Sequence, residues 1–140
     1  MLLNIKTGYR GIKKRKQNEI VFIVCNLEKI VDTCQKWCYT DGHAKNALSN
    51  FYDDLKYLDK LDWELINSRY WNNTQKDNDR MRRKQAEFLV YEKVELNCIQ
   101  GLIVKNEERK LEMEKIILNL DLSLKVYVDK LNKYLSLIHI

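Results

Sequence analysis

Short apolar runs separated by polar residues dominate the pattern of the chain. Residues 19–25 (EIVFIVC) form a continuous apolar run of strand length, rich in β-branched side chains. Such a run is typical of a central strand that is buried on both faces. Residues 101–105 (GLIVK) and 124–128 (LKVYV) predict two further strands, and residues 35–39 (QKWCY) alternate weakly before a turn signal, TDG, at 40–42.

Helical periodicity appears in the middle of the chain and again near its end. Apolar residues recur at three- and four-residue spacing and predict one helix with an apolar stripe: Ala44, Ala47, Leu48, Phe51, Leu55 and Leu58. Short helices are expected to begin after the caps Asn26 and Asp62. Asn106 caps a charged helix whose acidic residues come first, as the helix dipole favours. The sum predicts one α+β domain, a mixed sheet with inserted helices.

Residues 82–92 read RRKQAEFLVYE, and one ionisable residue, Glu87, interrupts the apolar part of this segment. If the segment is a strand, Glu87 shares a face with Leu89 and Tyr91. A carboxylate on a half-buried strand has lost water, which is costly unless it has a partner or a catalytic task. The alternative is that Glu87 stays solvated at a strand end and is balanced by Arg82 and Arg83.

The segment before this strand, positions 68–80, lacks periodicity and is rich in Asn and Asp, yet it opens with Tyr70 and Trp71. A polar loop that carries large aromatics beside a basic cluster is typical of a binding loop. The alternative is that the two aromatics fix a passive loop to the core.

Composition narrows the class of protein. The 25 Lys and Arg exceed the 20 Asp and Glu, for a net charge of +5. The excess is gathered in two clusters, Arg10 with Lys13 to Lys16 and Arg80 with Arg82 to Lys84, which suit a polyanion such as nucleic acid, although the first also fits a solvated loop. The chain lacks an apolar run of about 20 residues and a secretory signal, so a cytoplasmic protein without a membrane span is expected.

The four cysteines do not predict a metal site. Cys34 and Cys38 lie close together with His43 nearby, but Cys25 and Cys98 stand alone. Structural zinc sites usually combine two close ligand pairs, and the second pair is missing. Reduced, packed thiols are expected instead.

Several motifs, taken together and in order, resemble the DarT family of DNA ADP-ribosyltransferase toxins. They are TDGHA at 40–44, FYDDL at 51–55, LDKLDWELINSRYWN at 58–72 and RRKQAEFLV at 82–90. The resemblance implies an ADP-ribosyltransferase-like fold over residues 1–135. It also implies transfer of ADP-ribose from NAD, the substrate, to thymidine bases in single-stranded DNA. A macrodomain antitoxin would accompany a toxin of this kind, and we expect a monomer.

The resemblance also assigns roles to single residues. Glu87 matches the family's catalytic glutamate, and His43 matches a position near the NAD site, although a bond from His43 to the Asp41 carboxylate is an alternative. The loop before the glutamate holds the DNA strand in this family. Its candidate DNA contacts here are Tyr70, Trp71, Arg80, Arg82 and Arg83.

The chain also departs from the family pattern. In the family, a further segment with an NAD-contacting histidine and a catalytic arginine precedes the part that resembles MLLNI at 1–5. We therefore expect an N-terminally truncated enzyme that is inactive alone, or a non-catalytic remnant that binds single-stranded nucleic acid. Residues 136–140 (SLIHI) are expected to be a tail of doubtful origin rather than part of the domain.

Overall fold

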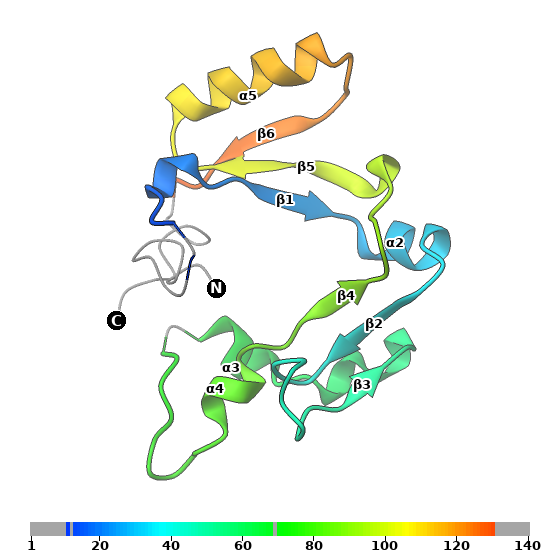
Figure 1. Cartoon of the computed structure of the whole chain (residues 1–140), viewed down its shortest axis with the longest axis vertical. Coiled ribbons are helices and arrows are strands. Elements are labelled where there is room, and N and C mark those ends of the chain that lie inside the picture. The colour runs from blue at the N-terminus through cyan, green and yellow to red at the C-terminus, as the bar shows by residue number, and fades with distance from the viewer. Residues whose placement is uncertain (1–10, 12, 69, 131–140) are drawn as a thin grey trace. The chain divides into compact units, whose positions relative to one another are not determined.

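The computed structural model describes residues 11, 13–68 and 70–130. Arg10 of the first basic cluster and the tail at 136–140 lie outside the described residues. The chain forms two compact units, one of residues up to Ile30 together with residues from Glu95 onward, and one of Val31–Val94. Each unit contains a three-stranded sheet (Figure 1). The expected α+β class is confirmed.

The first unit is a sheet covered by a helix. Strand β1 (Phe22–Cys25) pairs antiparallel with β5 (Ile99–Val104), and β5 pairs parallel with β6 (Lys125–Val128), in the order β1-β5-β6. Because parallel strands need a crossover, helix α5 (Glu107–Asn119) joins β5 to β6 and lies alongside them (Figure 1).

The core of this unit lies between α5 and the sheet. Val104, Ile117 and Val126 are buried there, and five partly buried side chains pack around them: Leu102, Met113, Leu122, Leu124 and Val128. Asn106 begins α5 as expected, since its side chain accepts a hydrogen bond from the backbone N–H of Arg109. The strand expected at 124–128 is also confirmed.

Strand β1 differs from the prediction of a central strand buried on both faces. Among the described residues β1 pairs with β5 alone, and it lies at the edge of its sheet. Ile23 is 60% exposed. An apolar run of strand length does not reveal how many neighbouring strands it pairs with. In the described part of the chain, β1 forms backbone hydrogen bonds with a strand on one side only. Lys13 to Lys16, which precede β1, are all exposed.

The second unit is built on the sheet β3-β2-β4, with β2 (Trp37–Thr40) paired antiparallel to β3 (Phe51–Tyr52) and to β4 (Phe88–Val90). One face carries stacked aromatic rings: the ring centroids of Trp37 and Phe88 are 5.5 Å apart, and those of Tyr39 and Tyr52 are 5.3 Å apart. Such offset pairs stabilise the sheet beyond the area they bury. Thr40 and the residue opposite it, Glu87, therefore belong to the other face.

Short helices complete the two units. The 3₁₀ turns are η1 (Gln17–Glu19), η2 (Leu55–Lys60) and η3 (Leu96–Cys98). Helix α2 (Leu27–Thr33) follows β1, and α3 (Trp63–Asn67) and α4 (Arg80–Arg83) belong to the second unit. Asp62 caps α3 as expected, because its carboxylate accepts from the backbone N–H of Leu65.

The long helix expected across positions 44–58 does not form. Residues 41–50 are a loop, Phe51–Tyr52 is strand β3, and η2 begins only at Leu55. The apolar stripe does not face a core, since Leu48 is 73% exposed and Phe51 is 56% exposed. The physical reason is that Phe51–Tyr52 pairs with β2, so the chain must turn back between 41 and 50 rather than continue as a helix.

Candidate active site

Glu87 lies immediately before β4, and its side chain is 36% exposed. The backbone N–H of Ala44 donates a hydrogen bond to Oε2 at 2.9 Å, and His43 Nδ1 lies 3.4 Å from the same oxygen. Because both contacts use Oε2, the other oxygen, Oε1, keeps its lone pairs for a hydroxyl group of a ligand. The carboxylate is thus held in one orientation while it remains accessible.

The backbone of Glu87 is fixed by Thr40, the last residue of β2. The Thr40 N–H donates to the Glu87 carbonyl at 2.9 Å, and the Glu87 N–H donates to Thr40 Oγ1 at 3.1 Å. The Thr40 hydroxyl in turn donates to the Gly42 carbonyl at 2.6 Å. The side chain of Thr40 is fully buried. These bonds join the start of β4 to the beginning of the loop that carries Ala44.

His43 is directed toward Glu87 and not toward Asp41, the alternative partner considered from the sequence. The Asp41 carboxylate accepts from the Asn50 N–H at 3.0 Å, from Asn50 Nδ2 at 2.7 Å and from Arg82 Nη1 at 2.9 Å. Burial alone would raise the pKa of Asp41, but the hydrogen bonds from Asn50 and Arg82 outweigh it and hold the pKa below its ordinary value. Asp41 is therefore an ionised structural group.

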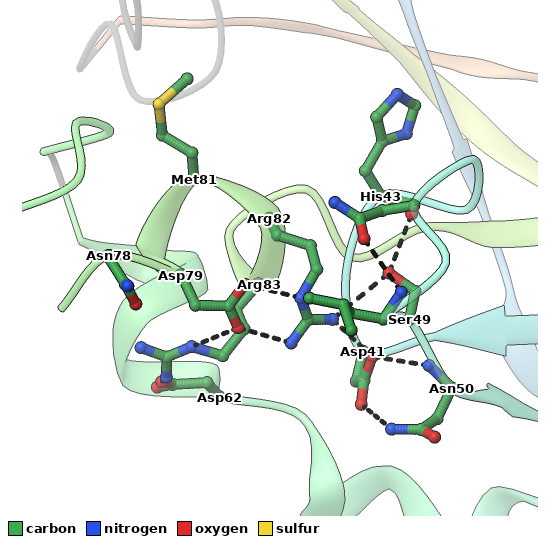
Figure 2. Close-up of polar contacts among 12 residues, drawn as sticks. Asp41, His43, Ser49, Asn50, Asp62, Asn78, Asp79, Met81, Arg82 and Arg83 are labelled. Carbon is green, nitrogen blue, oxygen red and sulfur yellow. Dashed lines mark hydrogen bonds and ion pairs between the residues drawn. The ribbon is translucent and has the colours of Figure 1, made fainter.

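Arg82 lies at the centre of an ion-pair network (Figure 2). Its Nε and Nη2 donate to the two carboxylate oxygens of Asp79 at 2.8 and 2.7 Å, and its Nη1 contacts Asp41 and, at 3.3 Å, Ser49 Oγ. The side chain is 12% exposed. The bonds from Arg82 lower the pKa of Asp79. A bidentate pair of this kind is stronger and more directional than a surface ion pair.

Arg83 is also committed to carboxylates. Its Nη1 donates to Asp62, the cap of α3, and its Nη2 donates to Asp77 at 2.6 Å, while Nε lies 3.6 Å from Asp79. The guanidinium groups of Arg82 and Arg83 thus contact aspartates, whereas the partners of Glu87 are Ala44 and His43. The alternative that these two arginines balance Glu87 is wrong.

The loop at 68–79 is fastened at its base by Lys84. This lysine is 6% exposed, and its ammonium donates to three backbone carbonyls: Leu65 at 3.0 Å, Ile66 at 3.1 Å and Ser68. It also lies 5.1 Å from the centroid of the Trp71 ring. Burial and then repulsion from Arg80 lower the pKa of Lys84. The carbonyls at the end of α3 offset that cost.

The two aromatics of this loop have different environments. Tyr70 is 76% exposed, whereas Trp71 is 39% exposed and covers Lys84. Arg80 donates to the Tyr70 carbonyl at 3.3 Å and to Ser68 Oγ at 3.0 Å, both neutral acceptors. Trp71 therefore fits the alternative of an aromatic that fixes the loop, while Tyr70 presents a free ring beside a cation.

Within residues 11, 13–68 and 70–130, the His, Cys, Asp and Glu side chains form no group of three that could hold a metal ion. Over the same described ranges, no helix is long and apolar enough to cross a membrane.

Three contributors to the site were missed by sequence reasoning: the N–H of Ala44, Ser49 and the structural role of Asp41. The first is a backbone group, which no side-chain motif can indicate. Ser49 lies in the segment that was expected to be a helix, and Asp41 lies in the turn just before it. The signal available was the TDG turn at 40–42, which favours a loop over a helix start.

The chain is similar in sequence to known DNA ADP-ribosyl transferases. The family model described as "ssDNA thymidine ADP-ribosyltransferase, DarT" matches residues 1–135. A DNA ADP-ribosyl transferase of Escherichia coli O127:H6 is 32% identical over 127 residues, which are 91% of this chain and 58% of that relative. One from Mycobacterium tuberculosis is 30% identical over 103 residues, 73% of this chain and 43% of that relative. The chain thus spans about half the length of these relatives.

Solved structures share the fold. Thermus sp. 2.9 DarT in complex with NAD+ superposes with a TM-score of 0.78 at 26% identity, covering 92% of this chain and 64% of that one. The same enzyme in complex with ADP-ribosylated ssDNA gives a TM-score of 0.78, covering 92% of this chain and 61% of that one. Because the family model matches residues 1–135 of the 140 in this chain, the chain belongs to the DarT family of ssDNA thymidine ADP-ribosyltransferases.

Proposed function

We propose that this chain carries the catalytic glutamate and the DNA-binding loop of an enzyme that transfers ADP-ribose from NAD to thymidine bases in single-stranded DNA. Glu87 is the catalytic residue in this proposal. The observation that supports it most directly is the carboxylate of Glu87, which is oriented through Oε2 by Ala44 while it stays 36% exposed.

The chemistry requires a group of this kind. The bond between the ribose C1 of NAD and the nicotinamide nitrogen breaks, a bond forms between C1 and the thymine base, and the base loses a proton. Positive charge develops on the sugar as nicotinamide leaves. A fixed carboxylate that accepts a hydrogen bond from a ribose hydroxyl orients the sugar and stabilises that charge. His43, whose Nδ1 lies 3.4 Å from the same carboxylate, is the candidate for a contact with NAD beside Glu87.

The DNA strand is assigned to the loop at 68–79. Tyr70 supplies an exposed ring on which a base can stack, and Arg80 supplies a charge bonded to neutral acceptors, suited to a phosphate. Trp71 is assigned a supporting role, because its ring packs over the ammonium of Lys84 at the base of the loop. Arg82 and Arg83 remain candidates for nucleic-acid contact by sequence, but their bonds to aspartates favour a structural role.

The setting of the reaction follows from its substrates. We place it in the cytoplasm, where NAD and single-stranded DNA occur together, as the activity of a monomeric toxin paired with a macrodomain antitoxin. The family resemblance supports this pairing. A DarTG chain from Thermosipho africanus in complex with ADP-ribose, 19% identical with a TM-score of 0.70, has the same fold over 33% of its own length.

The test compares this chain with a chimera in which it replaces the matched residues of the E. coli relative. Each is incubated with NAD and a thymidine-containing oligonucleotide, and the mass of the DNA is measured. In whichever of the two proteins modifies DNA, Glu87→Gln should abolish the addition of ADP-ribose. Glu92 is an exposed glutamate five residues further on, and Glu92→Gln should leave the addition intact. Persistent thymidine-dependent modification by the Glu87→Gln protein would contradict the assignment. If this chain and the chimera both bind the oligonucleotide and neither modifies it, the result would favour the non-catalytic remnant.

A further inference from the structure

The loop at 41–50 holds the groups that contact the carboxylate of Glu87. Ala44 and His43 lie in this loop, and its two ends are joined by Asp41 and Asn50. The Asp41 carboxylate accepts from both the N–H and the side-chain amide of Asn50, at 3.0 and 2.7 Å. The loop is therefore closed on itself, and its position depends on what holds it against the rest of the unit.

Arg82 supplies that attachment through two routes. Its side chain donates to Asp41 at 2.9 Å and to Ser49 Oγ at 3.3 Å, and the Ser49 hydroxyl donates to the His43 carbonyl at 2.8 Å. Its backbone carbonyl accepts from the His43 N–H at 3.0 Å. Residue 43 is thus held at its N–H and at its carbonyl, and the next N–H along the chain, that of Ala44, points at Glu87.

The guanidinium itself has little freedom. Two of its nitrogens are fixed by the bidentate pair with Asp79, at 2.8 and 2.7 Å, at the start of α4. Gly42 lies against the same side chain: a Cβ added there would be 2.4 Å from Arg82 Nη1 and 2.9 Å from the Arg82 carbonyl oxygen. Only a residue without a side chain allows the loop to approach this closely. Figure 2 shows Arg82 between Asp79 and Asp41, with the His43 ring directed away from the ion pairs.

We infer that Arg82 is a positioning residue for Glu87: through Asp41 and Ser49 it places the peptide between His43 and Ala44 against the catalytic carboxylate. This inference rests on the proposed function, and it gives Arg82 a task other than contact with DNA. Its side chain is 12% exposed and already bonded to two carboxylates, so a phosphate would have to displace an aspartate. A shift of about 1 Å in a catalytic group can lower a rate about a hundredfold.

The substitution Arg82→Lys distinguishes a role in positioning Glu87 from a role in contacting DNA. A phosphate contact tolerates lysine, which keeps the charge, whereas a bidentate pair that must also reach Asp41 does not. In the chimera with the E. coli relative, we expect kcat to fall about tenfold to a hundredfold. The KM for DNA and the dependence of DNA affinity on salt should stay unchanged. Arg109→Lys, the same change at a partly exposed arginine of α5 outside the candidate site, is the matched control and should keep kcat. An unchanged kcat in the Arg82→Lys protein would overturn the inference.

A second measurement does not depend on activity. In the ¹⁵N-labelled chain, the amide signal of Ala44 should move when Glu87→Gln removes the carboxylate charge. Arg82→Lys should move it in the same direction, because the N–H no longer meets Oε2. A wild-type Ala44 signal that ignores Glu87→Gln, or an Arg82→Lys protein that loses kcat with an unmoved Ala44 signal, would overturn the inference. Activity that survives Glu87→Gln, with the Ala44 signal still responding to Arg82→Lys, would instead remove the proposed function alone.

Ser49→Ala covers the case in which the Arg82→Lys protein does not fold. It deletes one hydroxyl between Arg82 and His43 and leaves both ion pairs of Arg82 in place. We expect the same direction of change in kcat and in the Ala44 signal, with a smaller fall of a few fold. A Ser49→Ala protein that matches the wild type in both measurements would overturn the inference.

Discussion

Lys84→Met removes one charge from the base of the loop at 68–79 and keeps the length of the side chain. The ammonium of Lys84 is 6% exposed and bonded to the carbonyls of Leu65, Ile66 and Ser68. Methionine fills the same space with an unbranched apolar chain. The substitution therefore tests the hydrogen bonds of the ammonium with little change in packing.

The size of the effect follows from these bonds. A hydrogen bond to a charged group contributes about 1.5–3 kcal/mol, so three independent bonds would contribute about 4.5–9 kcal/mol. Two effects reduce that sum. Burial of the ammonium has a cost, and the Leu65 carbonyl keeps its bond from the Ser68 N–H at 3.0 Å, while water can reach Ile66 and Ser68, which are half-buried. We expect a net loss of about 2–3 kcal/mol in the free energy of unfolding, the value of about one such bond.

The assay is urea unfolding followed by circular dichroism and by tryptophan fluorescence, with the midpoint compared at constant m-value. Lys76→Met is the matched control: Lys76 is exposed in the same loop, and its variant should stay within about 0.5 kcal/mol of the wild type. Equal midpoints for the two variants would refute the reasoning, since the buried ammonium would then contribute no net stability.

Further predictions concern the same unit. Tyr70→Ala should weaken binding of a single-stranded oligonucleotide by about 1–3 kcal/mol, measured by fluorescence anisotropy at fixed salt, and should leave stability unchanged. Trp71→Ala should instead lower the melting temperature, because the ring covers Lys84. Equal melting temperatures for the two variants would contradict this distinction. Because the folded-state pKa of Asp41 is below its unfolded value of about 3.9, its contribution to stability is present above that pH and is lost as pH falls through the folded pKa. The difference in urea midpoint between the wild type and Asp41→Asn should therefore be constant from pH 5 to 7 and shrink below about pH 4, and a pH-independent difference would be evidence against it. Gly42→Ala should cost about 1–3 kcal/mol of stability, because its Cβ would overlap Arg82; a wild-type melting curve would exclude this clash.

The sequence predicted best those elements whose signals are local. Asp62 and Asn106 each begin a helix because a side-chain oxygen meets an N–H three residues later, a contact that depends on a few neighbouring residues. Glu87 stands out for a similar reason, as the one ionisable group in an apolar segment, and its catalytic role stays a prediction. The two helix caps and the isolated carboxylate can be recognised without knowledge of the rest of the fold.

What the sequence could not predict depends on contacts between distant segments. The apolar residues from Ala44 to Leu58 have helical spacing, but pairing of Phe51–Tyr52 with β2 overrides it. The expected doubly buried strand at 19–25 is an edge strand among the described residues, since the apolar run does not encode its neighbours. Arg82 was predicted to contact DNA from the family resemblance, and its bond to Asp41, 41 positions away, could not be read from local spacing.

The attachment points of the loop at 68–79 have an evolutionary consequence. Lys84 and Arg83 fasten the two ends of the loop to carbonyls and carboxylates outside its tip, and Glu87 is held separately, by Thr40 and Ala44. Substitutions or length changes at the tip can therefore accumulate without moving the carboxylate. Under the proposed function, the preference for a DNA sequence can therefore diverge while the chemistry is inherited unchanged.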